Sequence, residues 1–267
     1  MIRQPFHHKI QISLLLLIPA LYLASCEKII DPDLKAAEPR IVIEGGITNR
    51  FENHLVKISR TIPFKEETTF NGIKGAQVTV RTSGGQVFSF SAAADGIYRS
   101  PRFRGLPGTT YNLEVNVEGN TYRSSSTMPR LVEADSIVFK QISIFGKSYI
   151  YPSVYYTDPP GEQNQYRYLV KVNDIFKTSQ VIDDRFSNGN STSDMITFDD
   201  GVLRGERVDL EMQCIDRDVF KYYYAISQME GDGGPPVAPS NPVSNIDNGA
   251  LGIFSAYTKS NFTVSLK

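Results

Sequence analysis

A period of two in hydrophobicity runs through most of this chain after Arg40 and constrains its fold more than any other feature. Apolar and polar residues alternate over residues 76–80, 111–117, 166–172 and 208–212. Successive side chains of a strand point to opposite faces, so each segment predicts a strand with one buried and one exposed face. The pattern predicts a mostly β chain of two β-sandwich-like domains.

Turn-forming residues and prolines divide the chain into parts. Dipeptides typical of turns, such as Asn71-Gly72 and Asp95-Gly96, separate the expected strands. The sequence predicts a tether over residues 26–39, a first sandwich over 40–130 and a second β-rich domain over 131–267. Strands of the second domain are expected near residues 136–144, 150–157, 165–173, 206–216 and 253–266.

One segment of the second domain predicts a helix near residues 217–229, with Asp216 as its N-cap. Phe220, Tyr223, Tyr224 and Met229 are expected to share much of one helix face. The glycines and prolines of residues 231–236 cannot continue a helix. Residues 177–200 and 231–248 are rich in turn-forming residues and are expected to form long irregular loops, which are functional or mobile in compact domains.

The N-terminus has the three parts of an export signal. A basic start is followed by an apolar stretch over residues 10–23 and then by Leu23-Ala24-Ser25-Cys26. This stretch of about 14 residues is shorter than the roughly 20 that a helix needs to span a bilayer. The pattern resembles the lipobox of bacterial lipoproteins and predicts a signal peptide over residues 1–25. The alternative is an ordinary secretory signal with an accidental cysteine.

The lipobox implies that Cys26 carries a lipid that anchors the chain to a membrane. Acyl chains contribute about 0.8 kcal/mol per buried CH₂, so several of them give a durable anchor. Glu27, Lys28, Asp31 and Asp33 loosely resemble the acidic export tags of surface-displayed Bacteroidota lipoproteins. We therefore expect an outer-membrane lipoprotein that faces the cell surface.

The residues that remain after cleavage exclude several function classes. Removal of residues 1–25 takes away two basic residues and no acid, which leaves 26 basic against 29 acidic residues. This balance gives no electrostatic footprint for nucleic acid or an anionic bilayer surface. His54 is the one remaining histidine, and Cys214 is the one cysteine besides Cys26. They cannot supply a His/Cys zinc site, and no cofactor is expected.

The same two residues make nucleophilic catalysis improbable. His54 lies in a polar lead-in to a strand and is expected at the surface or at a sheet edge. Cys214 falls at an inward position of a strand, so it is expected to act as a small buried hydrophobic residue. A Ser-His-Asp arrangement would have to use His54, and no GxSxG motif is present. We therefore expect that the protein is not an enzyme.

Several acids in one loop region are weak candidates for a calcium site: Asp183, Asp184, Asp194, Asp199 and Asp200. Calcium requires several carboxylate and carbonyl oxygens that converge on one point. The spacing matches no EF-hand, so solvated turns are the plainer interpretation. Paired carboxylates can also act as the acid and base of a glycosidase. Asp199 and Asp200 do not favour this hypothesis, because adjacent side chains of a strand point to opposite faces.

Tyr222 and Tyr223 are weak candidates for ligand binding. Tyrosine rings can form a stacking platform for sugars or bases. The plainer interpretation is that one or two tyrosines of the helix belong to the core and the others flank it.

The first domain has a recognisable succession of segments: residues 75–80, 87–90, 95–98 and 105–113. It resembles the carboxypeptidase-regulatory-like, transthyretin-type β-sandwich over about 60 residues. The resemblance implies a fold and carries no carboxypeptidase catalytic residues.

A second resemblance covers nearly the whole mature chain. The segment over residues 239–246 leads into a glycine-containing stretch over residues 248–256, after a tyrosine-rich helix. With the lipobox and residues 41–45, this ending resembles the Bacteroidota lipoproteins of the domain-of-unknown-function 4249 family. We expect Gly249 and Gly252 to allow close backbone approach where the last strand joins the second sheet.

The family resemblance implies a context and no established activity. Such lipoproteins tend to be encoded beside TonB-dependent outer-membrane transporters. The leading hypothesis is therefore a non-enzymatic accessory or ligand-capturing partner of such a transporter. A structural or adhesive surface module is the alternative, and a hydrolase with an unrecognised site is the third.

Overall fold

The computed structural model describes residues 38–62, 70–185, 187–229 and 241–267. The expected signal peptide, the lipid-attachment residue Cys26 and most of the expected tether lie outside these residues. In the part described, no helix has both the length and the apolar composition that crossing a bilayer requires.

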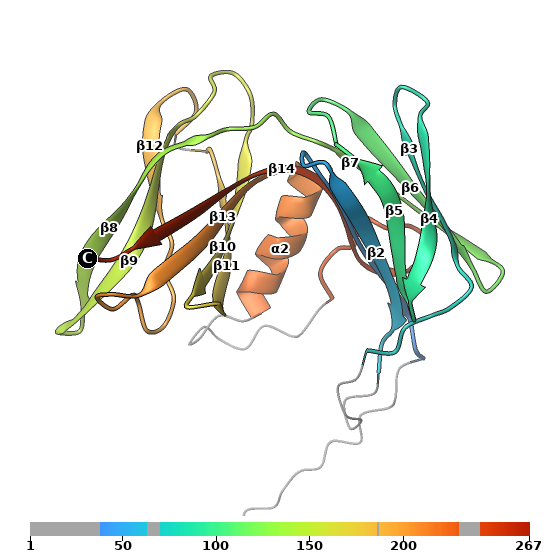
Figure 1. Cartoon of the computed structure of the whole chain (residues 1–267), viewed down its shortest axis with the longest axis horizontal. Coiled ribbons are helices and arrows are strands. Elements are labelled where there is room, and N and C mark those ends of the chain that lie inside the picture. Colours follow the sequence, from blue (N-terminus) through green and yellow to red (C-terminus); the bar gives the residue numbers. More distant parts are fainter. Residues whose placement is uncertain (1–37, 63–69, 186, 230–240) are drawn as a thin grey trace, which may run out of the picture. The chain divides into compact units, whose positions relative to one another are not determined.

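The prediction of a mostly β chain is confirmed (Figure 1). The strands of the first half are β1 (Ile41–Thr48), β2 (Glu52–Arg60), β3 (Gln77–Thr82), β4 (Val87–Ala94), β5 (Ile97–Phe103), β6 (Thr110–Val117) and β7 (Asn120–Thr127). Those of the second half are β8 (Ala134–Ile144), β9 (Lys147–Thr157), β10 (Gln165–Val172), β11 (Ile175–Asp183), β12 (Ser191–Met195), β13 (Arg207–Ile215) and β14 (Leu251–Ser265). The described helix is α2 (Arg217–Met229).

Eleven strands form one hydrogen-bonded sheet in the order β11-β10-β13-β14-β1-β2-β5-β4-β3-β6-β7, and β12-β9-β8 form a second sheet. The long strand β14 joins the two halves (Figure 1). Its first part pairs in parallel with β1, from Leu251 to Tyr257, and its second part pairs antiparallel with β13. From the sequence, this strand was predicted to join the second sheet alone. Its pairing with β1 was not predicted.

Each half encloses its own buried cluster, as sandwich-like packing requires. The first cluster contains residues of β1 to β7 together with Phe254 and Ala256 of β14. The second cluster lies between the β10–β13 region and the three-stranded sheet, and it includes Tyr166, Tyr168 and Cys214. Because one sheet runs through both halves, the division into domains at residue 130 stays a prediction.

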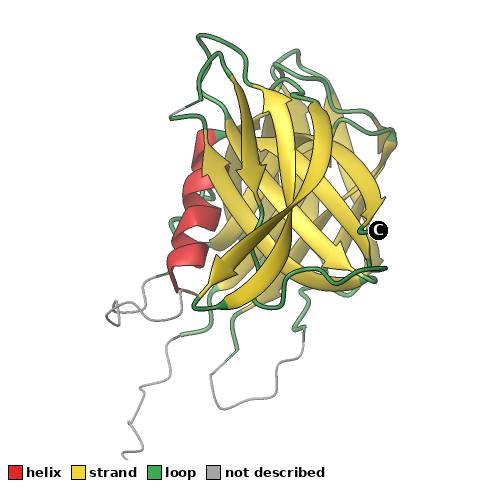
Figure 2. Cartoon of the chain, turned by 90° about the vertical axis from the view of Figure 1, so that its left-hand side faces the viewer, coloured by secondary structure: helices red, strands yellow, loops and turns green. Residues whose placement is uncertain are grey.

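The predicted helix is confirmed from Arg217 to Met229. Asp216 caps it, because Asp216 Oδ1 accepts hydrogen bonds from the backbone N of Val219 at 2.9 Å and of Asp218 at 3.1 Å. The helix contacts β10, β11 and β14 and lies beside the strands (Figure 2). Val219 is its fully buried residue, whereas Tyr224 and Met229 are about half exposed. Of the four residues expected to share one face, Phe220 and Tyr224 stack on each other with ring centroids 5.8 Å apart.

The prediction of an irregular loop over residues 177–200 is also wrong. Strand β11 extends to Asp183, and β12 follows at Ser191–Met195. Both strands lie at sheet edges, and β11 shows no clean alternation of buried and exposed side chains. Edge strands are often polar on both faces, so hydrophobic periodicity does not reveal them.

Candidate functional site

The most promising site is a hollow of about 250 Å³ between the central strands of the large sheet and helix α2. We call it the central hollow. Strands β1, β2, β10, β13 and β14 line it together with the helix. Its chemistry comes from Glu44, Lys57, Arg167, Tyr223, Ser255 and Tyr257.

Strand register explains why a hollow forms at this point. Gly46 of β1 lies opposite Ser255 of β14, so small residues meet where larger side chains would fill the space. A Cβ atom at Gly46 would stand 3.3 Å from Tyr257 Cε1. Alternation along β14 sends Phe254 and Ala256 into the first buried cluster and leaves Ser255 on the face toward the hollow.

Arg167 supplies a half-buried positive charge to this site. Its guanidinium carbon lies 3.6 Å from the ring centroid of Tyr223, a cation–π contact. Arg167 Nε donates to Ser179 Oγ at 2.9 Å, and Nη1 donates to Gln213 Oε1 at 3.5 Å. All three partners are neutral. Among the described residues, none of the ion pairs includes Arg167 or Lys57.

The hydroxyl groups of the hollow are suited to donating hydrogen bonds. Burial raises the pKa of Tyr223, although Arg167 opposes the shift, and burial also raises the pKa of Tyr257. Both phenols therefore stay protonated at neutral pH. Ser255 is 6% exposed, and its Oγ has no hydrogen-bond partner within the described residues. A buried hydroxyl without a partner is costly unless something else satisfies it.

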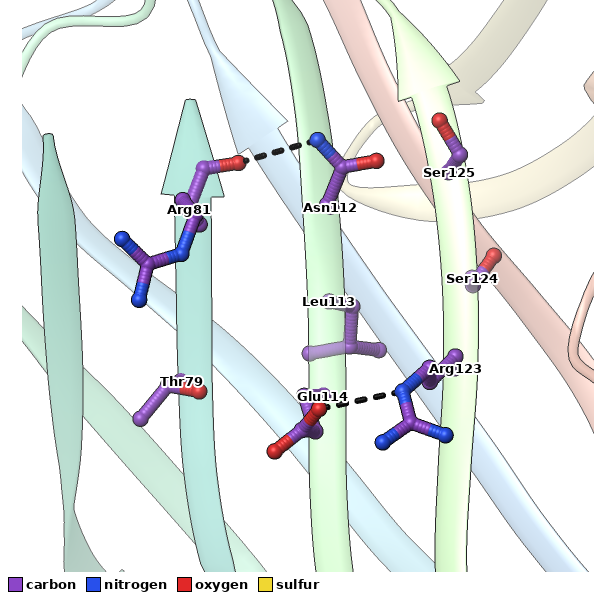
Figure 3. Close-up of a pocket in the computed structure, with 8 residues that line it drawn as sticks. All are labelled: Thr79, Arg81, Asn112, Leu113, Glu114, Arg123, Ser124 and Ser125. Carbon is purple, nitrogen blue, oxygen red and sulfur yellow. Dashed lines mark hydrogen bonds and ion pairs between the residues drawn. The ribbon is translucent and has the colours of Figure 1, made fainter. Parts of the chain in front are cut away.

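A larger hollow, of about 480 Å³, lies on the outer face of β3, β6 and β7 (Figure 3). Two pairs of residues that line it are already joined by hydrogen bonds. Glu114 Oε2 accepts from Arg123 Nε at 3.0 Å, and Asn112 Nδ2 donates to the Arg81 carbonyl at 3.4 Å. Hydrogen bonds from Asn116 and Arg123 lower the pKa of Glu114. We interpret this face as a solvated sheet surface, in spite of its size.

The structure does not gather the acids proposed for calcium into one site. Asp183 pairs with Arg185 at 2.6 Å, and Asp200 pairs with Lys177 at 3.3 Å. Within the described ranges, no group of three His, Cys, Asp or Glu residues is placed to hold a metal ion.

Two of the candidate acids are built into the protein interior. Asp184 is buried and accepts from the backbone N of Asn164 at 2.7 Å. Asp194 Oδ2 accepts from Tyr156 at 2.9 Å and from Tyr168 at 2.7 Å. Burial raises the pKa of Asp194, although the two tyrosine hydroxyls oppose the shift. Within the described residues, Asp199 forms neither a side-chain hydrogen bond nor an ion pair.

The expectation that His54 lies at the surface or at a sheet edge is wrong, because it is 2% exposed within β2, which lies between β1 and β5. Its Nε2 lies 3.0 Å from the Phe103 carbonyl, and its Nδ1 accepts from the backbone N of Thr48 at 3.4 Å. Burial lowers the pKa of His54, so the neutral ring is favoured. Backbone partners occupy both ring nitrogens, which gives His54 a structural role.

Cys214 is buried in the second cluster, so its prediction as a small hydrophobic residue is confirmed. Burial raises the pKa of its thiol. A buried thiol with a raised pKa is a poor nucleophile.

The two candidate tyrosines of the helix differ in their surroundings. Both pack against the small buried cluster of Ile215, Val219 and Ile253. Tyr223 also lines the central hollow, but the Arg167 guanidinium covers one face of its ring. The sequence did not identify Arg167, Ser255, Lys57 or Glu44 as site residues. The only local signal was the pair Gly45-Gly46 inside strand β1.

Comparison with known proteins places the chain in a family and assigns it no activity. The family described as "Domain of unknown function (DUF4249)" matches residues 27–263. No curated protein matches the chain. Among solved structures, the Yersinia pseudotuberculosis adhesin InvE matches at 14% identity and a TM-score of 0.22, over 65% of this chain and 55% of that one. This TM-score is too low to establish a shared fold. The family match spans most of the sequence, and the chain belongs to the DUF4249 family.

Proposed function

We propose that the protein is a non-enzymatic, lipid-anchored outer-membrane lipoprotein that faces the cell surface and captures a ligand as the accessory partner of a TonB-dependent transporter. The central hollow carries the capture part of this proposal. It combines a half-buried arginine with no ion-pair partner in the described part of the chain and a buried serine hydroxyl without a hydrogen bond. Ligand sites characteristically hold a few polar groups of this kind in a concave surface.

The proposed anchor is supported by the sequence before the globular part. Small residues at Ala24 and Ser25 precede Cys26 after a short apolar stretch, as lipoprotein processing requires. Replacement of Cys26 by alanine is expected to release the protein from the membrane fraction and to change its processed size. Unchanged fractionation and unchanged size would contradict the anchor.

A role in binding is favoured over catalysis by the composition of the central hollow. Its ionisable groups are Glu44, Lys57, Arg167 and two tyrosines, with neither histidine nor cysteine among its lining residues. An acyl-transfer or hydrolytic site pairs a nucleophile with a base within hydrogen-bond distance. His54 and Cys214, whose side chains often serve in such pairs, are both buried and do not line the hollow.

The transporter partner rests on the resemblance of residues 239–256 and the lipobox to lipoproteins encoded beside such transporters. Affinity purification of the tagged protein in mild detergent is expected to recover a TonB-dependent transporter. The Cys26→Ala variant, expressed at the same level, serves as the control, because it would not reach the same membrane. Repeated purification without a transporter would contradict this part of the proposal.

An adhesive module is the second candidate, and one observation favours it. Phe145 is fully exposed at the turn between β8 and β9, and it adopts a positive φ of 48°. Ile144 beside it is exposed as well, and adjacent exposed apolar residues, more than single ones, mark contact surfaces. Binding of the purified protein to cells or matrix, with loss of binding in Phe145→Ser and no transporter recovered, would support this alternative.

A further inference from the structure

We propose that the central hollow binds a small organic anion through a carboxylate or phosphate group, with Arg167 as its principal anchor. This inference rests on the proposed role in ligand capture and specifies the chemical class of the ligand. Three properties of the hollow support it: an uncompensated cation, hydrogen-bond donors beside that cation, and a limited volume.

Arg167 is the cation that would anchor the anion. Arg167 is half-buried, and its contacts with Tyr223, Ser179 and Gln213 are all with neutral groups. Charges withdrawn from water are normally paired, because their desolvation is costly. The stacking on Tyr223 fixes the plane of the guanidinium, and a planar fork of donors fits the paired oxygens of a carboxylate or a phosphate.

Counted over its lining residues alone, the hollow carries one more positive than negative charge, while Glu52 outside the lining acts on Tyr257. Lys57 adds a second cation at the rim, and Glu44, its partner across β1 and β2, is the one acid that lines the hollow. Nearby, Lys259 and Glu211 neutralise each other at 3.3 Å. A bound anion would therefore meet a net attractive field.

The hydroxyl groups that line the hollow can donate hydrogen bonds, and the acceptor Gln213 Oε1 is already bonded to Arg167. Ser255 Oγ is buried and has no hydrogen-bond partner within the described residues, and the raised pKa keeps Tyr257 protonated. An anionic oxygen accepts hydrogen bonds from hydroxyl groups and from a guanidinium at the same time. A neutral sugar would leave the charge of Arg167 without a counter-ion.

Volume limits the size of the ligand. A hollow of about 250 Å³ holds about eight water molecules at roughly 30 Å³ each. It suits a small organic acid or a phosphate ester.

The test is a titration of the full chain, purified in mild detergent, with succinate, citrate and inorganic phosphate as sodium salts. Calorimetry gives the dissociation constants, and sodium chloride at equal ionic strength and glucose are the reference solutes. We expect at least one of the three anions to bind, while chloride and glucose do not. Binding of the carboxylates alone or of phosphate alone would identify which oxyanion the site prefers.

Variants locate the binding. Arg167→Met is expected to weaken the affinity about tenfold or more, since charge-assisted hydrogen bonds are lost. Arg167→Lys keeps the charge but not the fork and should recover only part of the affinity. Gly46→Ala changes no charge and is expected to weaken binding by narrowing the hollow toward Tyr257. Arg81→Met, on the outer face of β3, is the matched control and should change the affinity less than about twofold.

Absence of binding by all three anions would overturn the inference, as would anion binding that Arg167→Met and Gly46→Ala leave unchanged. These results are separate from the transporter test. Recovery of a transporter with no anion bound would refute the ligand class and keep the partnership. Anion binding without recovery of a transporter would support the ligand class and refute the partnership.

Discussion

At the scale of single residues, backbone geometry gives the sharpest prediction at Gly252. Its φ is +99°, and a Cβ atom there would stand 2.1 Å from the Ile43 carbonyl oxygen. Gly252→Ala combines left-handed strain with a backbone clash at the junction of β14 and β1. We expect it to lower the free energy of unfolding by about 3 kcal/mol or more, measured by chemical denaturation.

Gly84→Ala is the control for this prediction. Its Cβ would meet only Thr82 Oγ1 at 3.8 Å, and its φ is not in the left-handed region. The free energy of unfolding should change by less than about 0.5 kcal/mol. If both substitutions lowered the free energy of unfolding equally, the close approach of the Ile43 backbone to Gly252 would not be the cause. The sequence predicted close approach at both Gly249 and Gly252, but Gly249 has only a positive φ of 74°, and a Cβ atom there would meet nothing nearer than 4.0 Å.

Half-buried Asp194 predicts a pH dependence with a definite sign. Burial raises its pKa in the folded protein above the unfolded value of about 4. The folded state therefore holds the proton more tightly, and stability falls as the pH rises through the folded pKa. Asp194→Asn removes this titration, so the stability of the wild type relative to the variant should fall as the pH rises from the unfolded pKa through the raised folded pKa, measured by denaturation.

Asp209→Asn is the opposite control. A hydrogen bond from Thr263, assisted by Arg207, lowers the pKa of Asp209. Its stabilising contribution is present above the unfolded pKa and disappears as the pH falls. The wild type should therefore lose stability relative to Asp209→Asn at low pH. The same sign for both variants would contradict the assignment of Asp194 as a carboxyl with a raised pKa.

His54 illustrates what sequence could not predict at this scale. A histidine among polar neighbours suggests a surface position, yet β2 carries it inward. Its burial depends on two backbone partners, the Phe103 carbonyl and the Thr48 amide, of which the first is 49 residues away. Whether the ring nitrogens of His54 find hydrogen-bond partners depends on strand register, which cannot be read from the local sequence.

At the scale of secondary-structure elements, the cap of helix α2 gives a third prediction. Asp216 accepts from two amides of the first turn, and Ser126 of β7 also donates to its carboxylate. Asp216→Ala removes the cap and is expected to cost about 1–2 kcal/mol of the free energy of unfolding, whereas Asp216→Asn keeps an accepting oxygen and should cost less than about 0.5 kcal/mol. Chemical denaturation of the three proteins compares them, and a larger cost for asparagine than for alanine would contradict the capping role.

Elements with strong local signals were predicted well. The helix bounds followed from Asp216 at one end and the glycine- and proline-rich segment at the other, and half-buried strands such as β6 and β10 followed from alternation. Edge strands β11 and β12 left no such pattern. The central hollow could not be predicted, because five strands and a helix from distant parts of the sequence build it. Tyr223 was its only member singled out as a ligand candidate.

At the scale of the whole molecule, β14 decides whether the first half can fold alone. Sequence placed a complete domain over residues 40–130, but Phe254 and Ala256 of β14 are fully buried within its cluster. Strand β1 also pairs with β14 from Val42 to Thr48. Loss of a buried phenylalanine side chain alone costs about 3–5 kcal/mol, a large part of a typical domain's stability.

A fragment of residues 40–130 is therefore expected to show no cooperative thermal transition by circular dichroism, because its core is incomplete and β1 becomes an open edge. Adding a peptide of residues 244–258 should restore a transition, and the same peptide with Phe254→Ser should not. A sigmoidal melt and a dispersed NMR spectrum from the fragment alone would show that the first half is autonomous. The expected result would instead mean that the first half completes its fold only after the last strand has been synthesised, so that the central hollow, lined by β1 and β14 together, forms in the same step.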